Sequence, residues 1–179
     1  MAESVFRSRI AEEGLDGLVA VDSAGTGGWH EGDGADPRTV AVLRAGGYDT
    51  THSARQFQVS WFADHDLVIA LDSGHLRELR RLAPTAEDAA KVRLLRSYAA
   101  DAVREEEEEE AGPGRPAPDE AGLDVPDPYY GGFEGFEECL EMVEAASVGL
   151  LAAVRAAVTT GTPDTSLPAG TPTGTKENA

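Results

Sequence analysis

The stretch Asp66-Leu67-Val68-Ile69-Ala70-Leu71-Asp72 decides the fold class of this chain. An apolar run between two acids is typical of a short strand that is buried on both faces of a sheet. Ser73 follows directly as the predicted N-cap of a helix whose inward residues are Leu76, Leu79 and Leu82. A buried strand that leads straight into a helix is the unit from which α/β folds with parallel sheets are built.

The segments on either side continue this alternation. Short apolar runs at Leu18–Val21 and Lys91–Leu95 predict two further strands. Helices are predicted over Glu3–Glu13, from Asp36-Pro37 to Gly46-Gly47, and over Phe133–Val158, the last with Phe136, Leu140, Val143, Ser147, Leu150 and Val154 facing inward. The pattern therefore predicts a doubly wound parallel sheet, which binds its ligand beyond the carboxyl ends of its strands. The loops after Val21, Leu71 and Leu95 are expected to meet at that edge.

The composition fits one acidic domain. The 179 residues carry a formal net charge of −18, much of it from Glu105–Glu110, and this sign argues against nucleic acid as a partner. We expect a domain over 1–158, interrupted by a mobile acidic insertion over 101–122 and followed by a disordered tail over 159–179. Neither an apolar run long enough to cross a membrane nor a secretory pattern at Met1–Arg9 is expected, which makes the cytoplasm the predicted location.

Three motifs occur in order along the chain: Val21-Asp22-Ser23-Ala24-Gly25-Thr26-Gly27, His52-Ser53-Ala54-Arg55-Gln56 and Asp127-Pro128-Tyr129-Tyr130-Gly131-Gly132. Together they resemble the low-molecular-weight protein tyrosine phosphatases of the bacterial type, over Met1 to about Arg155. The resemblance implies a flavodoxin-like sheet with parallel strands in the order 2-1-3-4. It also implies hydrolysis of phosphotyrosine in proteins, and of small aryl phosphates, through a phosphocysteine intermediate and without a cofactor.

The same resemblance implies a first strand and a loop of the form Cys-x5-Arg-Ser-Pro directly before Met1-Ala2-Glu3-Ser4, and the sequence contains neither. We therefore expect the chain as given to lack the nucleophile and the central strand, and to be inactive. Whether it is a true truncation or has a mis-assigned start is left open. One alternative function is a non-catalytic binding module. A lower-ranked alternative is an arsenate reductase relative, which would need further cysteines near Asp72–His75.

The resemblance also implies roles for residues around a substrate groove. Asp127 matches the general acid, which protonates the leaving phenolate and then accepts a proton from the hydrolytic water. Trp29, Tyr129 and Tyr130 match the aromatic walls of the groove, whose flat faces suit a phenyl phosphate. Taken alone, an aspartate before a proline is typical of a turn, which would make Asp127 a turn residue. The Tyr-Tyr-Gly-Gly that follows favours the role of general acid instead.

Further residues match positions that support the phosphate loop. These are Ser23, His52 and Asp72. Cys139 has Ala145 rather than an arginine six residues later, so we interpret it as a small apolar helix residue and not as a substitute nucleophile. No metal site is assigned, because the histidines lack ligand spacing with one another and with Cys139.

Overall fold

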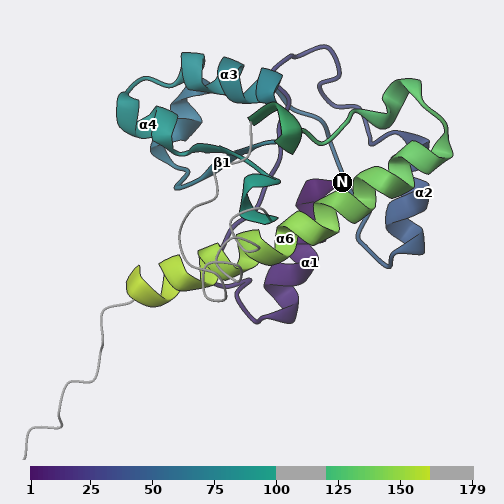
Figure 1. Cartoon of the computed structure of the whole chain (residues 1–179), viewed down its shortest axis with the longest axis horizontal. Coiled ribbons are helices and arrows are strands. Elements are labelled where there is room, and N and C mark those ends of the chain that lie inside the picture. The colour runs from purple at the N-terminus through teal and green to yellow at the C-terminus, as the bar shows by residue number, and fades with distance from the viewer. Residues whose placement is uncertain (100–119, 162–179) are drawn as a thin grey trace, which may run out of the picture.

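The structure is a computed structural model that describes residues 1–99 and 120–161 (Figure 1). Its elements are α1 (Ala2–Glu12), α2 (Pro37–Ala45), the 3₁₀ helix η1 (Val59–Ala63), β1 (Val68–Ala70), α3 (Ser73–Leu82), α4 (Ala86–Ala90), β2 (Val92–Leu94), the 3₁₀ helices η2 (Glu120–Leu123) and η3 (Pro128–Tyr130), and α6 (Phe133–Gly161). Strand, helices and strand alternate as the sequence predicts, and the fold class is α/β.

β1 and β2 are parallel neighbours, with Val68 opposite Val92 and Ala70 opposite Leu94. All four side chains are buried, which confirms the two strands that the apolar runs predict. α3 and α4 connect the strands, since a parallel pair needs a crossover rather than a hairpin. The carboxyl ends of β1 and β2 therefore lie at the same edge, as expected.

Apolar side chains pack on both faces of this pair, because successive residues of a strand point to opposite sides. On one face, Leu76 and Leu79 of α3 pack with Phe62 of η1 against the strands. On the other face, Ile69 of β1 packs against a cluster drawn largely from α1 and α6. Figure 1 shows this arrangement, with α3 and α4 on one side of β1 and with α1 and α6 on the other.

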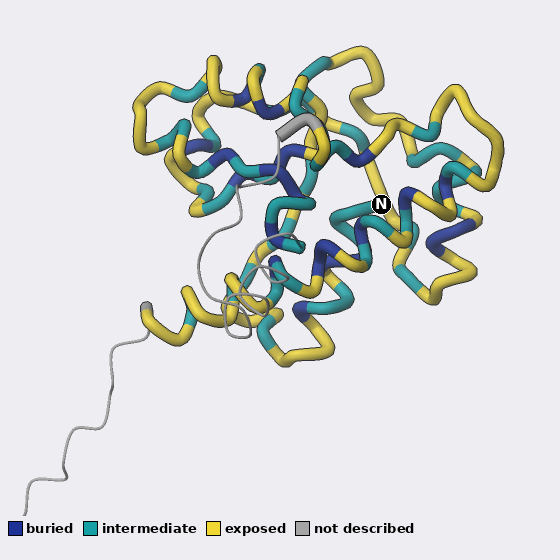
Figure 2. Tube along the Cα trace, viewed as in Figure 1, coloured by how far each residue is buried: buried dark blue, intermediate teal, exposed yellow. Residues whose placement is uncertain are grey.

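α6 is the main support of the second face. Phe136, Val143, Ser147 and Leu150 are buried, and Leu140 and Val154 are partly buried, so the predicted inward face is confirmed. Figure 2 shows the buried residues along this face and exposed residues at the far end of the helix. A Cβ at Gly149 would lie 2.3 Å from the carbonyl oxygen of Tyr98, so only glycine lets the backbones approach this closely.

The strand predicted at Leu18–Val21 is not formed. Leu18 is 70% exposed, and Val19 and Val21 are only partly buried where they pack against the α1 and α6 cluster. A strand needs a hydrogen-bonded neighbour, and no described residue pairs with this segment as a strand. Beyond β1 and β2, the described residues contain a single parallel bridge, Gly25 to Gln56.

Three features of α3 and α6 differ from the prediction. The N-cap of α3 is Asp72 rather than Ser73, because the Asp72 carboxylate accepts the backbone N–H of His75. Leu82 is 40% exposed rather than inward, since it lies in the last turn of α3. α6 continues to Gly161, past the expected end of the domain at Val158. Of the expected mobile insertion over 101–122, residues 120–122 belong to η2, and residues 101–119 lie outside the described part, as do residues 162–179.

The expectation that no apolar run could cross a membrane is wrong on composition. Phe133–Thr160 is long and apolar enough to do so, with a mean hydropathy of 1.5 in its most apolar window. The core helix of a soluble protein passes the same test. Here the helix contributes its buried face to the packing against α1 and α2.

Candidate active site

The acid loop, Asp127-Pro128-Tyr129-Tyr130-Gly131, is a turn of 3₁₀ helix with Asp127 as its N-cap. One carboxylate oxygen of Asp127 accepts the backbone N–H of Tyr129 at 3.0 Å. Pro128 suits the first helical position because its ring fixes φ and no N–H is needed there. The rings of Tyr129 and Tyr130 meet edge to face, 5.1 Å apart, and are 56% and 93% exposed. The loop thus presents a carboxylate beside two solvent-facing aromatic rings.

The segment before the acid loop is tied to the carboxyl edge of the sheet. The backbone N–H of Val125 donates to the Leu71 carbonyl just after β1. The backbone N–H and the hydroxyl of Ser73 both donate to the Asp124 carboxylate, at 2.7 and 3.1 Å. Arg96, just after β2, donates to the Asp124 carbonyl at 2.8 Å. The acid loop therefore begins at the edge where doubly wound sheets bind ligands.

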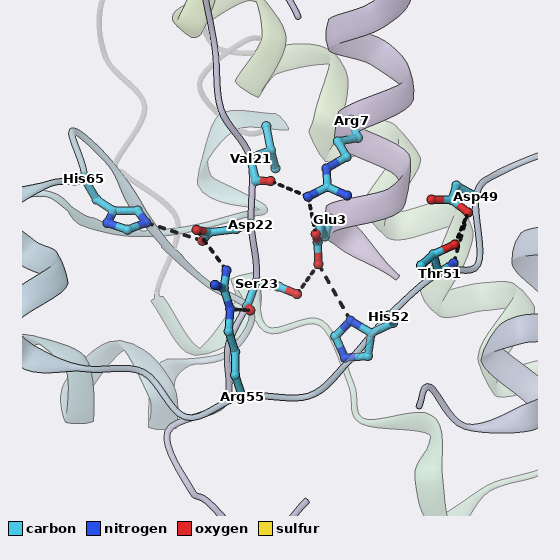
Figure 3. A network of polar contacts seen from close by, with 10 residues as sticks. All are labelled: Glu3, Arg7, Val21, Asp22, Ser23, Asp49, Thr51, His52, Arg55 and His65. Atoms are coloured by element: carbon cyan, nitrogen blue, oxygen red, sulfur yellow. Dashed lines mark hydrogen bonds and ion pairs between the residues drawn. The ribbon is translucent and has the colours of Figure 1, made fainter. Parts of the chain in front are cut away.

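A second group of polar residues converges on Glu3 in the first turn of α1 (Figure 3). The Ser23 hydroxyl donates to one Glu3 oxygen, and His52 Nδ1 lies 3.8 Å from the same oxygen. Arg7 pairs with the other oxygen at 2.8 Å and also donates to the Val21 carbonyl. The structure thus brings together Ser23 and His52, two of the three predicted supporting residues, through a carboxylate that the sequence analysis did not single out.

The backbone at Ser23 is held from its other side as well. Arg55 donates to the Ser23 carbonyl at 3.0 Å and pairs with the Asp22 carboxylate at 2.9 Å. His65 approaches the same carboxylate at 3.3 Å, and the Arg55 guanidinium lies over the Trp61 ring. Figure 3 shows Ser23 between these contacts and Glu3. The motif around residues 52–56 therefore fixes the loop that carries Ser23.

Asp72, the third predicted supporting residue, does not join the Glu3 group. Its carboxylate caps α3 and pairs with Nδ1 of the His75 ring. Partial burial raises the pKa of Asp72, but the hydrogen bonds from His75 and Gly74 outweigh burial, and the net pKa lies below the ordinary value. The contacts of Asp72 in the described structure are those of a helix cap.

Replacing Asp72 with Asn is expected to destabilise the chain at neutral pH by a few tenths to about 1 kcal/mol, the usual contribution of a carboxylate at a helix N-terminus. The folded pKa of Asp72 is lowered, so its charge stabilises the fold above the unfolded pKa. This stabilisation is lost as the pH falls through the folded pKa. Urea unfolding from neutral to acid pH should therefore show a deficit that disappears in acid. The exposed Asp66 provides the matched control, Asp66→Asn, and a deficit in Asp72→Asn that did not vary with pH would contradict this account.

The predicted groove residue Trp29 makes no ring contact with the two tyrosines among the described aromatic pairs. Its side chain is 89% exposed, and its ring covers Gly27 so closely that a Cβ there would overlap it. Among the described aromatic pairs, Tyr129 contacts Tyr130, whereas the Trp29 ring packs against the backbone at Gly27. The structure therefore places two of the three predicted wall residues together.

Cys139 is the one cysteine of the sequence, and it is 8% exposed within α6. Burial raises the pKa of its thiol, the Met1 amino group opposes this, and Asp127 adds to it, with a net upward shift. A thiol needs its thiolate form to act as a nucleophile, and a buried, raised pKa disfavours that form. The interpretation of Cys139 as a packing residue agrees with this environment.

Comparisons with known proteins identify a matching family and several similar proteins. The family model described as low molecular weight phosphotyrosine protein phosphatase matches residues 1–111 and 115–160. A low molecular weight protein-tyrosine-phosphatase of Streptomyces coelicolor is 66% identical over 155 residues, which cover 87% of this chain and 85% of the relative. Low molecular weight protein-tyrosine phosphatase A of Mycobacterium tuberculosis H37Rv is 42% identical over 150 residues, 84% of this chain and 80% of the relative.

A solved structure supports the same fold. The crystal structure of a protein tyrosine phosphatase from Entamoeba histolytica, with Hepes in its active site, superposes with a TM-score of 0.72 at 27% identity. The superposition covers 87% of this chain and 88% of the other. These relatives are named as phosphatases, so they give no support to an arsenate reductase.

Proposed function

Because the chain belongs to the low molecular weight phosphotyrosine protein phosphatase family, we propose that Asp127 is the general acid of its reaction. The observation that carries this proposal is the position of the acid loop. Its entry is bound to the carboxyl end of β1 through Val125 and Leu71, and its carboxylate stands beside the exposed rings of Tyr129 and Tyr130. A phenyl phosphate that stacks against these rings would bring its ester oxygen close to the carboxylate.

In this reaction a thiolate attacks phosphorus and the bond from phosphorus to the phenolic oxygen breaks. Asp127 donates its proton to that oxygen, so that phenol rather than phenolate leaves. The Asp127 carboxylate then takes a proton from water as the water oxygen attacks the phosphorus of the phosphocysteine, and the P–S bond breaks to release phosphate and return the thiolate. The attacking thiolate is not supplied by Cys139, which is buried in α6. We therefore propose that the 179 residues contribute the acid and the groove, and that turnover needs a Cys-x5-Arg loop that they do not contain.

Ser23 and His52 support that loop in this proposal, through Glu3. The three side chains meet at one carboxylate in the first turn of α1, and the family pattern places the phosphate loop directly before this helix. A helix N-terminus also stabilises a bound phosphate, since its free N–H groups point at the anion. A cytoplasmic location fits the same chemistry, because a catalytic thiolate persists in a reducing compartment.

The aromatic rings are proposed to select aryl phosphates. The test uses the extended form, defined as this chain with a family first strand and Cys-x5-Arg-Ser-Pro loop placed directly before Met1. It should hydrolyse a phosphotyrosine peptide roughly 100-fold faster than the matched phosphoserine peptide in kcat/KM. Trp29→Ala and Tyr130→Ala should each reduce the phosphotyrosine rate by about two- to tenfold, as expected for the loss of one aromatic contact.

Val148→Ala is the matched control, since Val148 is an exposed apolar residue of α6 distant in sequence from the acid loop. Equal hydrolysis of the two peptides, or wild-type rates in both aromatic variants, would count against aryl selection by these rings. Such a result would not bear on the role of Asp127, which is tested separately.

A further inference from the structure

Arg38 occupies a position at a helix N-terminus, where a cation is not expected. It lies in the first turn of α2, after the N-cap Asp36 and Pro37, and the partial positive charge of a helix N-terminus disfavours a cation there. Asp36 offsets this cost and fixes the guanidinium. Its two carboxylate oxygens accept from Nε and Nη2 of Arg38 at 3.1 and 2.9 Å, which is a bidentate pair. One of these oxygens also accepts the backbone N–H of Arg38 at 2.7 Å.

The guanidinium held in this way reaches the acid loop. Nη2 donates to the Tyr129 carbonyl at 3.1 Å, and Nη1 donates to the Gly131 carbonyl at 3.3 Å. The same group lies over the ring of Phe136, 4.4 Å from its centroid, and 5.6 Å from the centroid of Tyr129. Phe136 is buried in the first turns of α6. One side chain therefore joins α2, the acid loop and the start of α6.

We propose that Arg38 is the positioning residue of the acid loop and sets the place of the Asp127 carboxylate at the leaving group. This inference rests on the proposed role of Asp127 as the general acid. Upstream of Asp127, Asp124 and Val125 are bound to the carboxyl edge of β1 and the start of α3. Downstream, the two carbonyls are bound by Arg38. Asp127 thus lies between two anchors, and its own backbone is held by neither.

The chemistry of these contacts requires arginine. The guanidinium is planar and carries five N–H donors in a fixed fork, so it can pair with Asp36, donate to two carbonyls and stack on a ring at the same time. A lysine ammonium keeps the charge but cannot reproduce the bidentate pair or the stacking. Arg38→Lys should therefore restore only part of what Arg38→Gln removes.

The first test uses the 179-residue chain and needs no catalysis. Amide hydrogen exchange of Tyr129 and Gly131 is measured on the millisecond scale in wild type, Arg38→Gln, Arg38→Lys and Arg44→Gln. Arg44 is an exposed residue in the last turn of α2 and serves as the control. The amide exchange rate should rise roughly three- to tenfold in Arg38→Gln, because an acid loop that has lost one or two hydrogen bonds to its carbonyls opens more often. It should rise less in Arg38→Lys and stay unchanged in Arg44→Gln.

Wild-type exchange at both amides in Arg38→Gln would overturn the proposal. So would an equal rise in Arg44→Gln. If Arg38→Gln fails to fold, Arg38→Lys and Asp36→Asn are the variants to compare. Each weakens the hydrogen bonds between the Arg38 side chain and the acid loop and leaves the Phe136 contact partly in place. Wild-type exchange in both of these variants would also overturn it.

The second test separates this inference from the function on which it rests. In the extended form, kcat/KM is measured with phenyl phosphate, whose leaving group needs a proton, and with 2,4-dinitrophenyl phosphate, whose leaving group does not. Arg38→Gln should reduce kcat/KM for phenyl phosphate by roughly tenfold or more and leave kcat/KM for the activated ester within about twofold. If Asp127→Asn shows this selectivity and Arg38→Gln does not, the role of Arg38 is wrong. If neither variant shows it, the role of Asp127 is wrong.

Discussion

The 179-residue chain is expected to show no measurable hydrolysis of phosphotyrosine, and the extended form is expected to be an active phosphatase. The difference should be on the order of 10⁶-fold in kcat, which is what removal of a catalytic nucleophile can cost. The reason is the state of Cys139. Its thiol is 8% exposed, burial raises its pKa, and no arginine stands six residues later.

The measurement is release of phosphate from a phosphotyrosine peptide by both proteins at equal concentration. Cys139→Ala should leave the extended form unchanged, whereas replacing the cysteine of its added loop with serine should abolish turnover. Hydrolysis by the 179-residue chain that is lost in Cys139→Ala would show that Cys139 is the nucleophile and contradict the assignment. Tight binding of the peptide by this chain without hydrolysis would instead favour the alternative of a non-catalytic binding module.

The elements that local sequence specifies were predictable. The run at 66–72 and its partner at 91–95 contain enough apolar residues to be buried on both faces, and both are strands. The segment at Leu18–Val21 has the same local character, yet it pairs with nothing in the described residues. Pairing is a property of two segments, so a strand whose neighbour is missing cannot be distinguished from a true strand by its own residues.

The candidate site was predictable only where a motif carried it. The resemblance assigned Asp127, Tyr129 and Tyr130 because they are adjacent and their context is specific, and their roles stay predictions. Glu3 and Arg38 were missed, although the one joins Ser23 to His52 and the other binds the acid loop. Their partners lie far away in the sequence, and the local signal of each, a charged residue in a first helical turn, indicates at most a favourable or unfavourable interaction with the helix dipole.

Asp72 illustrates a different limit. The resemblance assigns it to the phosphate loop, while the sequence places it one residue before the predicted cap Ser73. In the structure Asp72 is itself the cap, and Ser73 binds Asp124. A serine and an aspartate are about equally good N-caps, so local preference could not decide between neighbours. The contact with Asp124, which leads into the acid loop, made the difference.

Asp127→Asn in the extended form is the second change with a large expected effect. Asparagine keeps the size of the side chain and an oxygen that can accept the Tyr129 N–H, and it is as good an N-cap as aspartate. The turn of η3 should therefore persist, and the variant removes only the proton donor. We expect kcat/KM for phenyl phosphate to fall by about 10²- to 10⁴-fold, the range typical of general acid catalysis.

The leaving group decides whether this loss reflects proton donation. Dinitrophenolate departs without a proton, so kcat/KM for its phosphate ester, which reports only the steps up to departure of the leaving group, should fall by less than about tenfold in Asp127→Asn. Glu134→Gln is the matched control, because Glu134 is an exposed acid in the first turn of α6 and should be silent with both esters. A loss of equal size for the two esters would mean that Asp127 acts on the reaction only through the shape of its loop. In that case the carboxylate would be a cap of η3 and the general acid would have to be sought elsewhere in the groove.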